Sequence, residues 1–453
     1  MHKRLNDRML QVSAFAAKAT QGLLQKTHPL QAKWIRIDSA PLPRSSHTLS
    51  VVAGRAYIFG GEINPREPVD NDMHVVTLPS GSVTSADYRS VPAKPESAGG
   101  QVPEKRVGHT AAVIGERIFV FGGRGGKEMK PLEENGRVWV YNTRLDTWSY
   151  IDPEPDTPHP AARSYHTSVS IDQPQPSSMK PVKVDQAREL PRTGEIAQHA
   201  QSEAQKGFGT FFVHAGCPAS GRTNDLWAFD VHSRTWKELP SAPGNPRGGT
   251  SLTVSKNRIF RYGGFNGKDE EGGKLDVLEL ALQTFNDTSG LEPVGITTKG
   301  GWSTLDFTEE DMRCPGNRSV AGFQTITTGM GREYLALFLG EKEPSSDGHN
   351  AAGNFWSDVW VFQAPPKGMT GASVKDATWQ ALGKETGEGV WSQVFVSDAE
   401  GEEGDDVKNL TPTPRGWFSS SVLTDMGTTG LLLWGGLNAK NDRLGDGWVL
   451  SFD

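Results

Sequence analysis

Six arginine residues stand at corresponding places along the chain, each at the start of an apolar segment that reads as a β-strand. They are Arg44, Arg106, Arg163, Arg247, Arg318 and Arg415. We expect these strands to line a central channel, so that the six guanidinium groups converge on one mouth. Arginine offers forked donors that fit carboxylate, sulfate or phosphate, and the set therefore predicts a site for a small anion. The alternative is structural, with each arginine holding backbone carbonyls or acidic side chains in place.

Three histidines follow three residues after the first three arginines, at His47, His109 and His166. Their repetition favours packing and hydrogen bonding over metal ligation. Cys217 and Cys314 are the only cysteines, too few for a disulfide framework and without the paired spacing of a zinc site. We expect both to be reduced thiols.

The composition indicates an all-β protein, because 52 Gly and 29 Pro accompany 13 Trp and 19 Phe. With 47 basic and 54 acidic residues, the net charge of −7 provides no footprint for nucleic acid or for an anionic membrane surface. No apolar run is long enough to span a bilayer. We expect a cytoplasmic monomer.

One pattern recurs six times and must position these side chains. An arginine opens an apolar strand, a second strand ends in Gly-Gly, a third carries aromatic and aliphatic residues, and a tryptophan marks a fourth. The clearest copy runs from Arg106 through Phe121-Gly122-Gly123 to Trp148, and the fifth offers either Trp379 or Trp391. The sixth copy lacks its fourth strand, whereas residues 33–37, around Trp34, form an unclaimed strand before the first copy. An N-terminal strand that completes the last blade would close a ring without open sheet edges.

The pattern resembles the kelch repeat, which is about 50 residues long and forms β-propellers. The resemblance covers Trp34 to Asp453 and implies one all-β, six-bladed kelch propeller over residues 31–453, closed by an N-terminal strand. Gly-Gly fits a place where backbone must turn and approach closely, and the tryptophans fit the gaps between blades. These motifs specify the fold and not the function.

The loop from Leu339 to Phe355 in the fifth copy resembles the plant specifier proteins, kelch propellers that include nitrile-specifier, epithiospecifier and thiocyanate-forming proteins. The resemblance implies dependence on ferrous iron, held by Glu, Asp and His with three residues between successive ligands. Glu341 and His349 match the outer positions, whereas Ser345 occupies the middle one, and Asp347 stands nearby as a substitute. Two carboxylates and an imidazole would suit Fe(II).

The same resemblance implies anion capture by early-blade arginines, at Arg44 and Arg106 in this chain. The alternative for the loop is a solvated polar turn.

Two functions follow. The first, which we prefer, is a binding or interaction module for a protein or a small anionic ligand, with no certain cofactor. The second is a specifier-like, Fe(II)-dependent protein that acts on a small reactive sulfur- or nitrogen-containing metabolite. The residues do not decide whether the protein is an enzyme.

Three segments depart from the repeat. Residues 1–30 show an apolar helical face and few acidic residues, which predicts an N-terminal amphipathic helix, either a strap on the propeller or a mitochondrial targeting segment. Residues 173–207 form a polar insertion that we expect to be a mobile flap or a disordered spacer. Residues 396–410 form an acidic loop.

Overall fold

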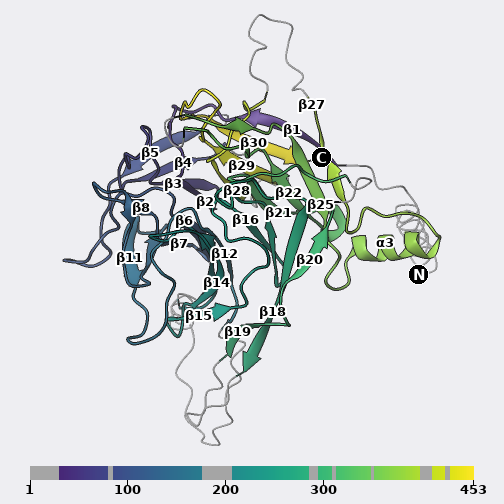
Figure 1. The fold of residues 1–453 in the computed structure, drawn as a ribbon, viewed down its shortest axis with the longest axis horizontal. Coiled ribbons are helices and arrows are strands. Elements are labelled where there is room, and N and C mark those ends of the chain that lie inside the picture. The colour runs from purple at the N-terminus through teal and green to yellow at the C-terminus, as the bar shows by residue number, and fades with distance from the viewer. Residues whose placement is uncertain are drawn as a thin grey trace, which may run out of the picture.

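The computed structural model describes residues 30–79, 85–175, 207–284, 294–308, 313–347, 351–397, 411–423 and 429–452. Six antiparallel sheets surround a central axis, which confirms the six-bladed propeller (Figure 1). The expected N-terminal helix lies outside the described residues, as do most of the insertion at 173–207 and of the acidic loop at 396–410.

Each blade has four main strands, which run in order from the innermost to the outermost. Blade 1 contains β2 (Thr48–Val52), β3 (Arg55–Phe59), β4 (Met73–Thr77) and β5 (Asp87–Val91). Blade 2 contains β6 (Thr110–Ile114), β7 (Arg117–Phe121), β10 (Val138–Asn142) and β11 (Thr147–Ile151). Blade 3 contains β12 (Thr167–Ile171), β13 (Thr210–Gly216), β14 (Thr223–Asp230) and β15 (Thr235–Leu239).

The other three blades follow the same order. Blade 4 contains β16 (Ser251–Ser255), β17 (Arg258–Tyr262), β18 (Lys274–Thr284) and β20 (Ser303–Asp306), and β19 (Val294–Thr298) pairs with the far end of β18. Blade 5 contains β21 (Gly322–Thr328), β22 (Arg332–Phe338), β25 (Val359–Gln363) and β26 (Trp391–Gln393). Blade 6 contains β28 (Ser419–Leu423), β29 (Gly430–Trp434), β30 (Gly447–Phe452) and β1 (Gln31–Arg36).

The N-terminal strand closes the ring as the sequence predicts. Strand β1 runs antiparallel to β30, with Trp34 opposite Leu450. Strand β27 (Phe395–Ser397) then covers the outer edge of β1 in parallel. Because both chain ends share one sheet, the first and last repeats are held together by strand hydrogen bonds.

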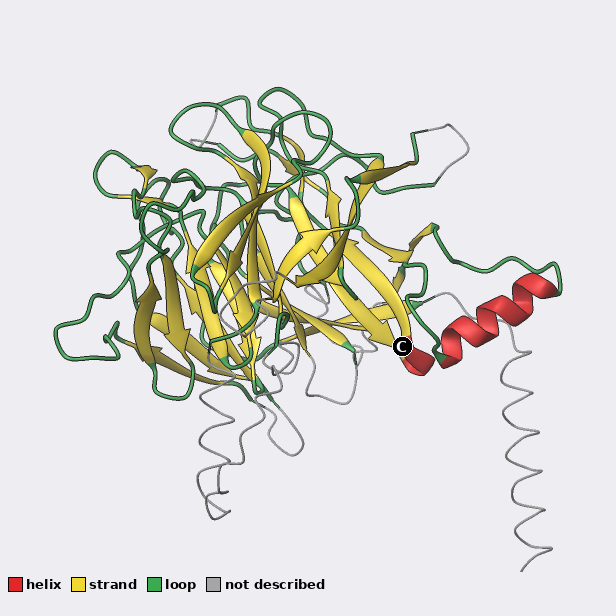
Figure 2. Cartoon of the chain, turned by 90° about the horizontal axis from the view of Figure 1, so that it is seen from below, coloured by secondary structure: helices red, strands yellow, loops and turns green. Residues whose placement is uncertain are grey.

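A few short elements lie outside the blades. Strands β8 (Arg124–Gly125) and β9 (Lys130–Pro131) pair with each other, as do β23 (Glu341–Glu343) and β24 (Asn354–Phe355). The 3-10 turn η2 (Gly329–Gly331) leads into β22, and helix α3 (Gly371–Ala381), which contains Trp379, projects beside blade 5 (Figure 2). Within the described ranges, no helix is long and apolar enough to cross a membrane.

Aromatic side chains fill the gaps between blades. Trp148 of β11 packs on Phe59 of the preceding blade, with ring centroids 4.8 Å apart, and Trp236 of β15 packs on Phe121 at 5.2 Å. Trp391, and not Trp379, plays this part in blade 5, at 5.6 Å from Tyr262. Burial of these large rings stabilises each interface between neighbouring blades.

Two rings of backbone hydrogen bonds join the blades around the axis. In the first, the glycine at the second Gly-Gly position, where Ala215 and Leu339 replace the first glycine in blades 3 and 5, donates its N–H to the carbonyl of the next blade's opening arginine. The six bonds run from Gly61 to Arg106, Gly123 to Arg163, Gly216 to Arg247, Gly264 to Arg318, Gly340 to Arg415 and Gly436 to Arg44, with lengths of 2.8–3.0 Å. The Gly-Gly and Arg motifs are therefore two halves of one contact that repeats between blades.

The second ring lies two residues after each arginine. In each blade, the backbone N–H of this residue donates to the backbone carbonyl oxygen of the matching residue in the preceding blade, at 2.7–3.2 Å. Its members, all with positive φ, are Ser46, Gly108, Tyr165, Gly249, Val320 and Trp417. Four of the six are not glycine, so the fold tolerates left-handed backbone here to close the ring.

The three histidines pack across these contacts, as the repetition suggested. All three imidazoles are buried, and burial lowers the pKa of His47 and of His166 to about 3, which keeps them neutral. The His166 ring lies against Gly122, where a Cβ would stand 2.9 Å from His166 Cε1 and 2.7 Å from the Arg163 carbonyl oxygen. In blade 2, Gly122 is thus required by space as well as by its positive φ.

A substitution at Gly122 tests this packing. We expect Gly122→Ala to cost ~1–2 kcal/mol for the left-handed backbone. The clash with Arg163 and His166 should add a further ~1–3 kcal/mol. Urea denaturation measures the loss in the free energy of unfolding.

Gly115→Ala is the matched control, because Gly115 has φ +59° but no atom within 4 Å of the added Cβ. It should show only the backbone cost. Equal losses in the two variants would contradict the requirement for space at the blade interface.

Candidate functional site

A cavity of about 550 Å³ opens on the channel axis at the end where the second strands finish, and we call it the mouth cavity. Its wall includes the residue that follows the Gly-Gly position in every blade. These are Glu62, Arg124, Cys217, Phe265, Glu341 and Leu437. Each is fixed by a β-bridge to the residue after its blade's opening arginine. The repeat fold thus presents six variable side chains at equivalent points around one cavity.

The six predicted anion-binding arginines lie elsewhere. Arg44, Arg106, Arg163, Arg247, Arg318 and Arg415 are at most 6% exposed and are absent from the wall of the mouth cavity. Each donates from Nη1 to the carbonyl of its own blade's first Gly-Gly position, at 2.9–3.2 Å. The guanidinium groups therefore brace the turns that surround the cavity.

Carboxylates complete this arrangement. Arg106 binds both oxygens of Glu134, and equivalent forked pairs join Arg163 to Asp225, Arg318 to Asp358 and Arg415 to Asp446. Arg44 bonds His74 and lies 3.9 Å from Asp70, and Arg247 lies 3.7 Å from Glu271. Burial raises the pKa of the Asp225 carboxyl, but the hydrogen bond from Arg163 and its charge outweigh burial and hold that pKa below its usual range. The geometry favours the structural role for the six arginines, and their assignment to an anion site stays a prediction.

Three other arginines line the mouth cavity, and two of them, Arg124 and Arg222, come from blades 2 and 3. Arg124 donates from Nε and Nη2 to Ser164 Oγ, at 3.0 and 2.8 Å, and its guanidinium carbon lies 4.7 Å from the Tyr165 ring centroid. Arg222 stacks on Phe265 at 5.0 Å, and its Nε is buried without a hydrogen-bond partner among the residues that the structure describes. Neither has a carboxylate partner in the part of the chain that the structure describes.

The repeat pattern did not single out Arg124 or Arg222, because neither residue opens a copy of the repeat. Arg124 directly follows Gly122-Gly123, so its place in the repeat was a usable signal. Cys217, between them in the wall, is a partly buried thiol. Burial raises its pKa, against the opposing charges of Arg222 and Arg124, so the thiol remains protonated at neutral pH.

A buried ion pair closes one side of the wall. Arg443 donates to Glu62 Oε1 at 3.0 Å, and the two side chains are 5% and 8% exposed. This pair is neutral as a unit, so it adds little net charge to the cavity.

Two acidic residues stand at blades 4 and 5. Glu341 lines the cavity at 6% exposure, and Glu270 beside it is 7% exposed and accepts from Ser319 Oγ at 3.1 Å. Burial raises the pKa of Glu341 to about 7, partly offset by Trp417 and by the Gly353 backbone. Burial, reinforced by the charge of Glu341, raises the pKa of Glu270 to about 8. No motif pointed to Glu270, which lies in the loop between β17 and β18.

The predicted iron ligands are only partly brought together. Glu341 is on the cavity wall, Ser345 also lines it, and Asp347 is exposed. His349 lies outside the described residues. Among the side chains that are described, no three of His, Cys, Asp or Glu gather in a group that could hold a metal ion. The iron site therefore stays a prediction, with Glu341 as its one implied ligand on the cavity wall.

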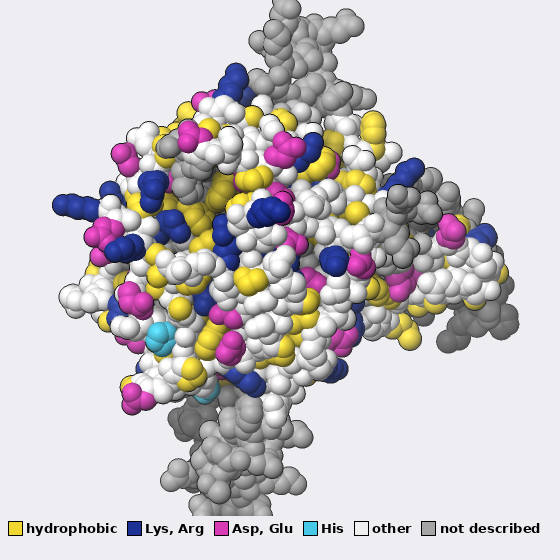
Figure 3. Space-filling view, in the orientation of Figure 1, with side chains coloured by type: hydrophobic (Ala, Val, Ile, Leu, Met, Phe, Trp, Pro, Cys, Tyr) yellow, Lys and Arg dark blue, Asp and Glu magenta, His cyan; other side chains and the backbone are white. Residues whose placement is uncertain are grey.

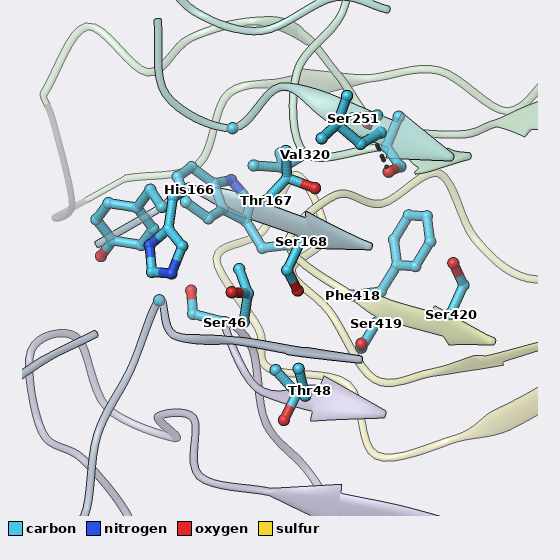
Figure 4. A pocket seen from close by; sticks show the side chains of 18 of the residues that line it. Ser46, Thr48, His166, Thr167, Ser168, Ser251, Val320, Phe418, Ser419 and Ser420 are labelled. Carbon is cyan, nitrogen blue, oxygen red and sulfur yellow. Dashed lines mark hydrogen bonds between the residues drawn. The ribbon is translucent and has the colours of Figure 1, made fainter. Parts of the chain in front are cut away.

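Tyr165 and Trp417 form the floor of the mouth cavity. They meet edge to face, with centroids 5.3 Å apart. Beyond them lies a second cavity of about 210 Å³, lined by the six innermost strands and the residues that lead into them. Hydroxyl groups dominate it, including those of Thr48, Ser168 and Ser419 (Figure 4). It contains no Lys, Arg, Asp or Glu among the described residues that line it, so of these two channel cavities only the mouth cavity has charged side chains in its wall.

The comparisons with known proteins agree with this fold. Residues 31–174 match the family described as the KLHDC2/KLHL20/DRC7 Kelch-repeats domain. The solved structure of YjhT superposes with a TM-score of 0.54 and 12% identity, over 92% of this chain and 99% of that one. That likeness concerns the fold alone.

Two curated relatives show different coverage. The chain is 23% identical over 442 residues to N-(sulfonatooxy)prop-2-enimidothioate sulfolyase from Thlaspi arvense, covering 91% of this chain and 95% of that protein. It is 23% identical to Kelch domain-containing protein 3 from Homo sapiens over 243 residues, and spans about half of that protein's length.

Substitution of a buried arginine distinguishes bracing from ligand binding. Arg106→Ala leaves the Gly122 carbonyl without its side-chain donor and Glu134 without its cation, although Trp139 Nε1 still donates to Glu134, so we expect the free energy of unfolding to fall by ~3–5 kcal/mol. Arg222→Ala removes a side chain with no such partner and should cost less than ~1 kcal/mol. Thermal or urea unfolding provides both values, and equal stability of the two variants would contradict the bracing role.

Proposed function

We propose that this chain, a kelch-repeat β-propeller that resembles the plant specifier proteins, binds a small organic anion in its mouth cavity. The observation that carries the proposal is the pair Arg124 and Arg222, which reach the cavity with guanidinium donors that no carboxylate occupies among the described residues. A volume of about 550 Å³ is within the range of small-molecule sites.

The two guanidinium groups are held ready for an anion. Stacking on Tyr165 and Phe265 restricts each to a plane, which leaves N–H groups at the edges. Sulfate, sulfonate and carboxylate groups accept such edge donors in a bidentate way. Because the cavity is partly enclosed by aromatic residues, these charged hydrogen bonds are less screened than on an open surface.

Surface charge does not point to a polyanion. Basic and acidic side chains are interspersed over the face seen in Figure 3, and the chain carries a net charge of −7. The guanidinium groups of Arg124 and Arg222 lie together at the cavity and do not form part of an extended basic surface. This arrangement favours a small ligand over nucleic acid. A protein partner for the propeller stays a prediction.

Calorimetry with ethanesulfonate tests the proposal. Arg222→Ala should weaken binding by about ten- to a hundredfold, as loss of charged hydrogen bonds requires. Arg144→Ala removes an exposed arginine that pairs with Glu116 away from the cavity, and it should leave the affinity unchanged. If ethanesulfonate does not bind, or binds Arg222→Ala as tightly as the unaltered protein, the cavity is not the anion site.

A second candidate function is a sulfolyase-like activity on a sulfate-bearing metabolite. The likeness to the Thlaspi arvense protein favours it, because the match covers nearly the whole of that relative, whose name specifies a sulfonatooxy group. Arg124 and Arg222 would then hold the sulfate group. Of the iron ligands that the resemblance implies, the described residues place Glu341 alone at the cavity.

Anaerobic calorimetry with Fe(II) separates the two candidates. The sulfolyase-like function predicts stoichiometric binding to the metal-stripped protein, lost in both Glu341→Gln and His349→Ala. Asp347→Asn tests the substitute ligand in the same way. Ethanesulfonate binding that needs no metal, together with absent Fe(II) binding, would leave the binding function and contradict the iron-dependent one.

A further inference from the structure

The repeat geometry places unlike charges on opposite sides of the mouth cavity. The innermost strands contact one another in the closed order β2, β6, β12, β16, β21, β28 and back to β2, so blade 2 faces blade 5 across the axis. Tyr165 of blade 3 and Trp417 of blade 6 agree with this, since their rings meet across the channel. Arg124 and Glu341 hold the same position in blades 2 and 5, and they therefore face each other.

The charge on each side is not cancelled by protein groups next to it. Arg443 of blade 6 forms an ion pair with Glu62 of blade 1 and neutralises it. This ion pair includes neither Arg124 and Arg222 nor Glu341. Glu341 and Glu270 form no ion pair within the described ranges. Of the lysines around them, Lys268 lines the cavity but is largely exposed and lies 3.8 Å from Asp269, and Lys342 lies over the Trp356 ring.

Both acidic side chains are more than nine-tenths buried, and Glu270 Oε2 has no hydrogen-bond partner among the described residues. A buried carboxyl without a cation is costly unless it meets a positive group or keeps a proton. A cationic group in the cavity would stabilise the ionised form of Glu341, while Glu270, whose pKa burial raises to about 8, keeps its proton at neutral pH. The aromatic rings of Trp417 and Tyr165 between the two sides would also favour an ammonium group, through cation–π attraction.

We propose that the ligand of the mouth cavity is a small zwitterion, whose anionic end lies on Arg124 and Arg222 and whose ammonium end lies on Glu341. This rests on the proposed anion binding and specifies the ligand class further. Amino acids and aminosulfonates have the required form. Opposed charges with aromatic residues between them select such a ligand over a simple anion, because each end meets a group of opposite charge that has no ion-pair partner among the described residues.

Three matched probes test the inference by calorimetry. Taurine carries a sulfonate and an ammonium group, ethanesulfonate carries the sulfonate alone, and ethylamine the ammonium alone. Taurine should bind the unaltered protein at least about tenfold more tightly than ethanesulfonate. In Glu341→Gln the affinities for taurine and for ethanesulfonate should lie within about twofold of each other. The ethanesulfonate affinity of this variant should equal that of the unaltered protein, which would show that the cavity is intact.

Glu343→Gln is the matched control, since Glu343 is an exposed residue two positions along the same strand and should leave the preference for taurine in place. If ethanesulfonate binds but taurine binds no more tightly, the zwitterion inference fails and the anion site stands. A preference for taurine that survives Glu341→Gln also overturns the inference. If neither sulfonate binds, the proposed anion function itself is wrong.

Discussion

The two rings of hydrogen bonds around the channel are the constraint on which the structure depends. At the inner turns of each repeat, a glycine N–H and a carbonyl at the arginine find their partners only in the neighbouring blades. Buried backbone groups must be paired, so a repeat standing alone would leave these unsatisfied. The last bonds, from Gly436 to Arg44 and from Ser46 to Trp417, exist only when the sixth blade meets the first.

This constraint also explains where function can lie. The arginines that the pattern emphasises are used to brace the Gly-Gly turns, with carboxylates already bound to their outer edges. The residue just after each turn is held by a β-bridge but is free in its side-chain type. Glutamate, arginine, cysteine, phenylalanine and leucine all occur there, so ligand chemistry can vary at these points without loss of the fold.

The sequence was sufficient for the fold because its signals are local and repeated. The unclaimed strand around Trp34 and the missing fourth strand of the last copy predicted the closure that β1 makes with β30. The site was harder to predict, because a strand-opening arginine gives no sign of whether it faces a channel or a neighbouring carboxylate. Arg222 and Glu270 lie in loops between strands and reach the cavity region only through the fold, so neither residue belongs to a readable motif.

The central claim is that the ligand chemistry resides in the variable positions of the mouth cavity and not in the repeated arginines. A crystal structure of the protein soaked with ethanesulfonate tests it most directly. The account predicts sulfonate density in contact with Arg124 and Arg222, above the floor of Tyr165 and Trp417. Density bound to any of the six strand-opening arginines, with their carboxylate partners displaced, would contradict it.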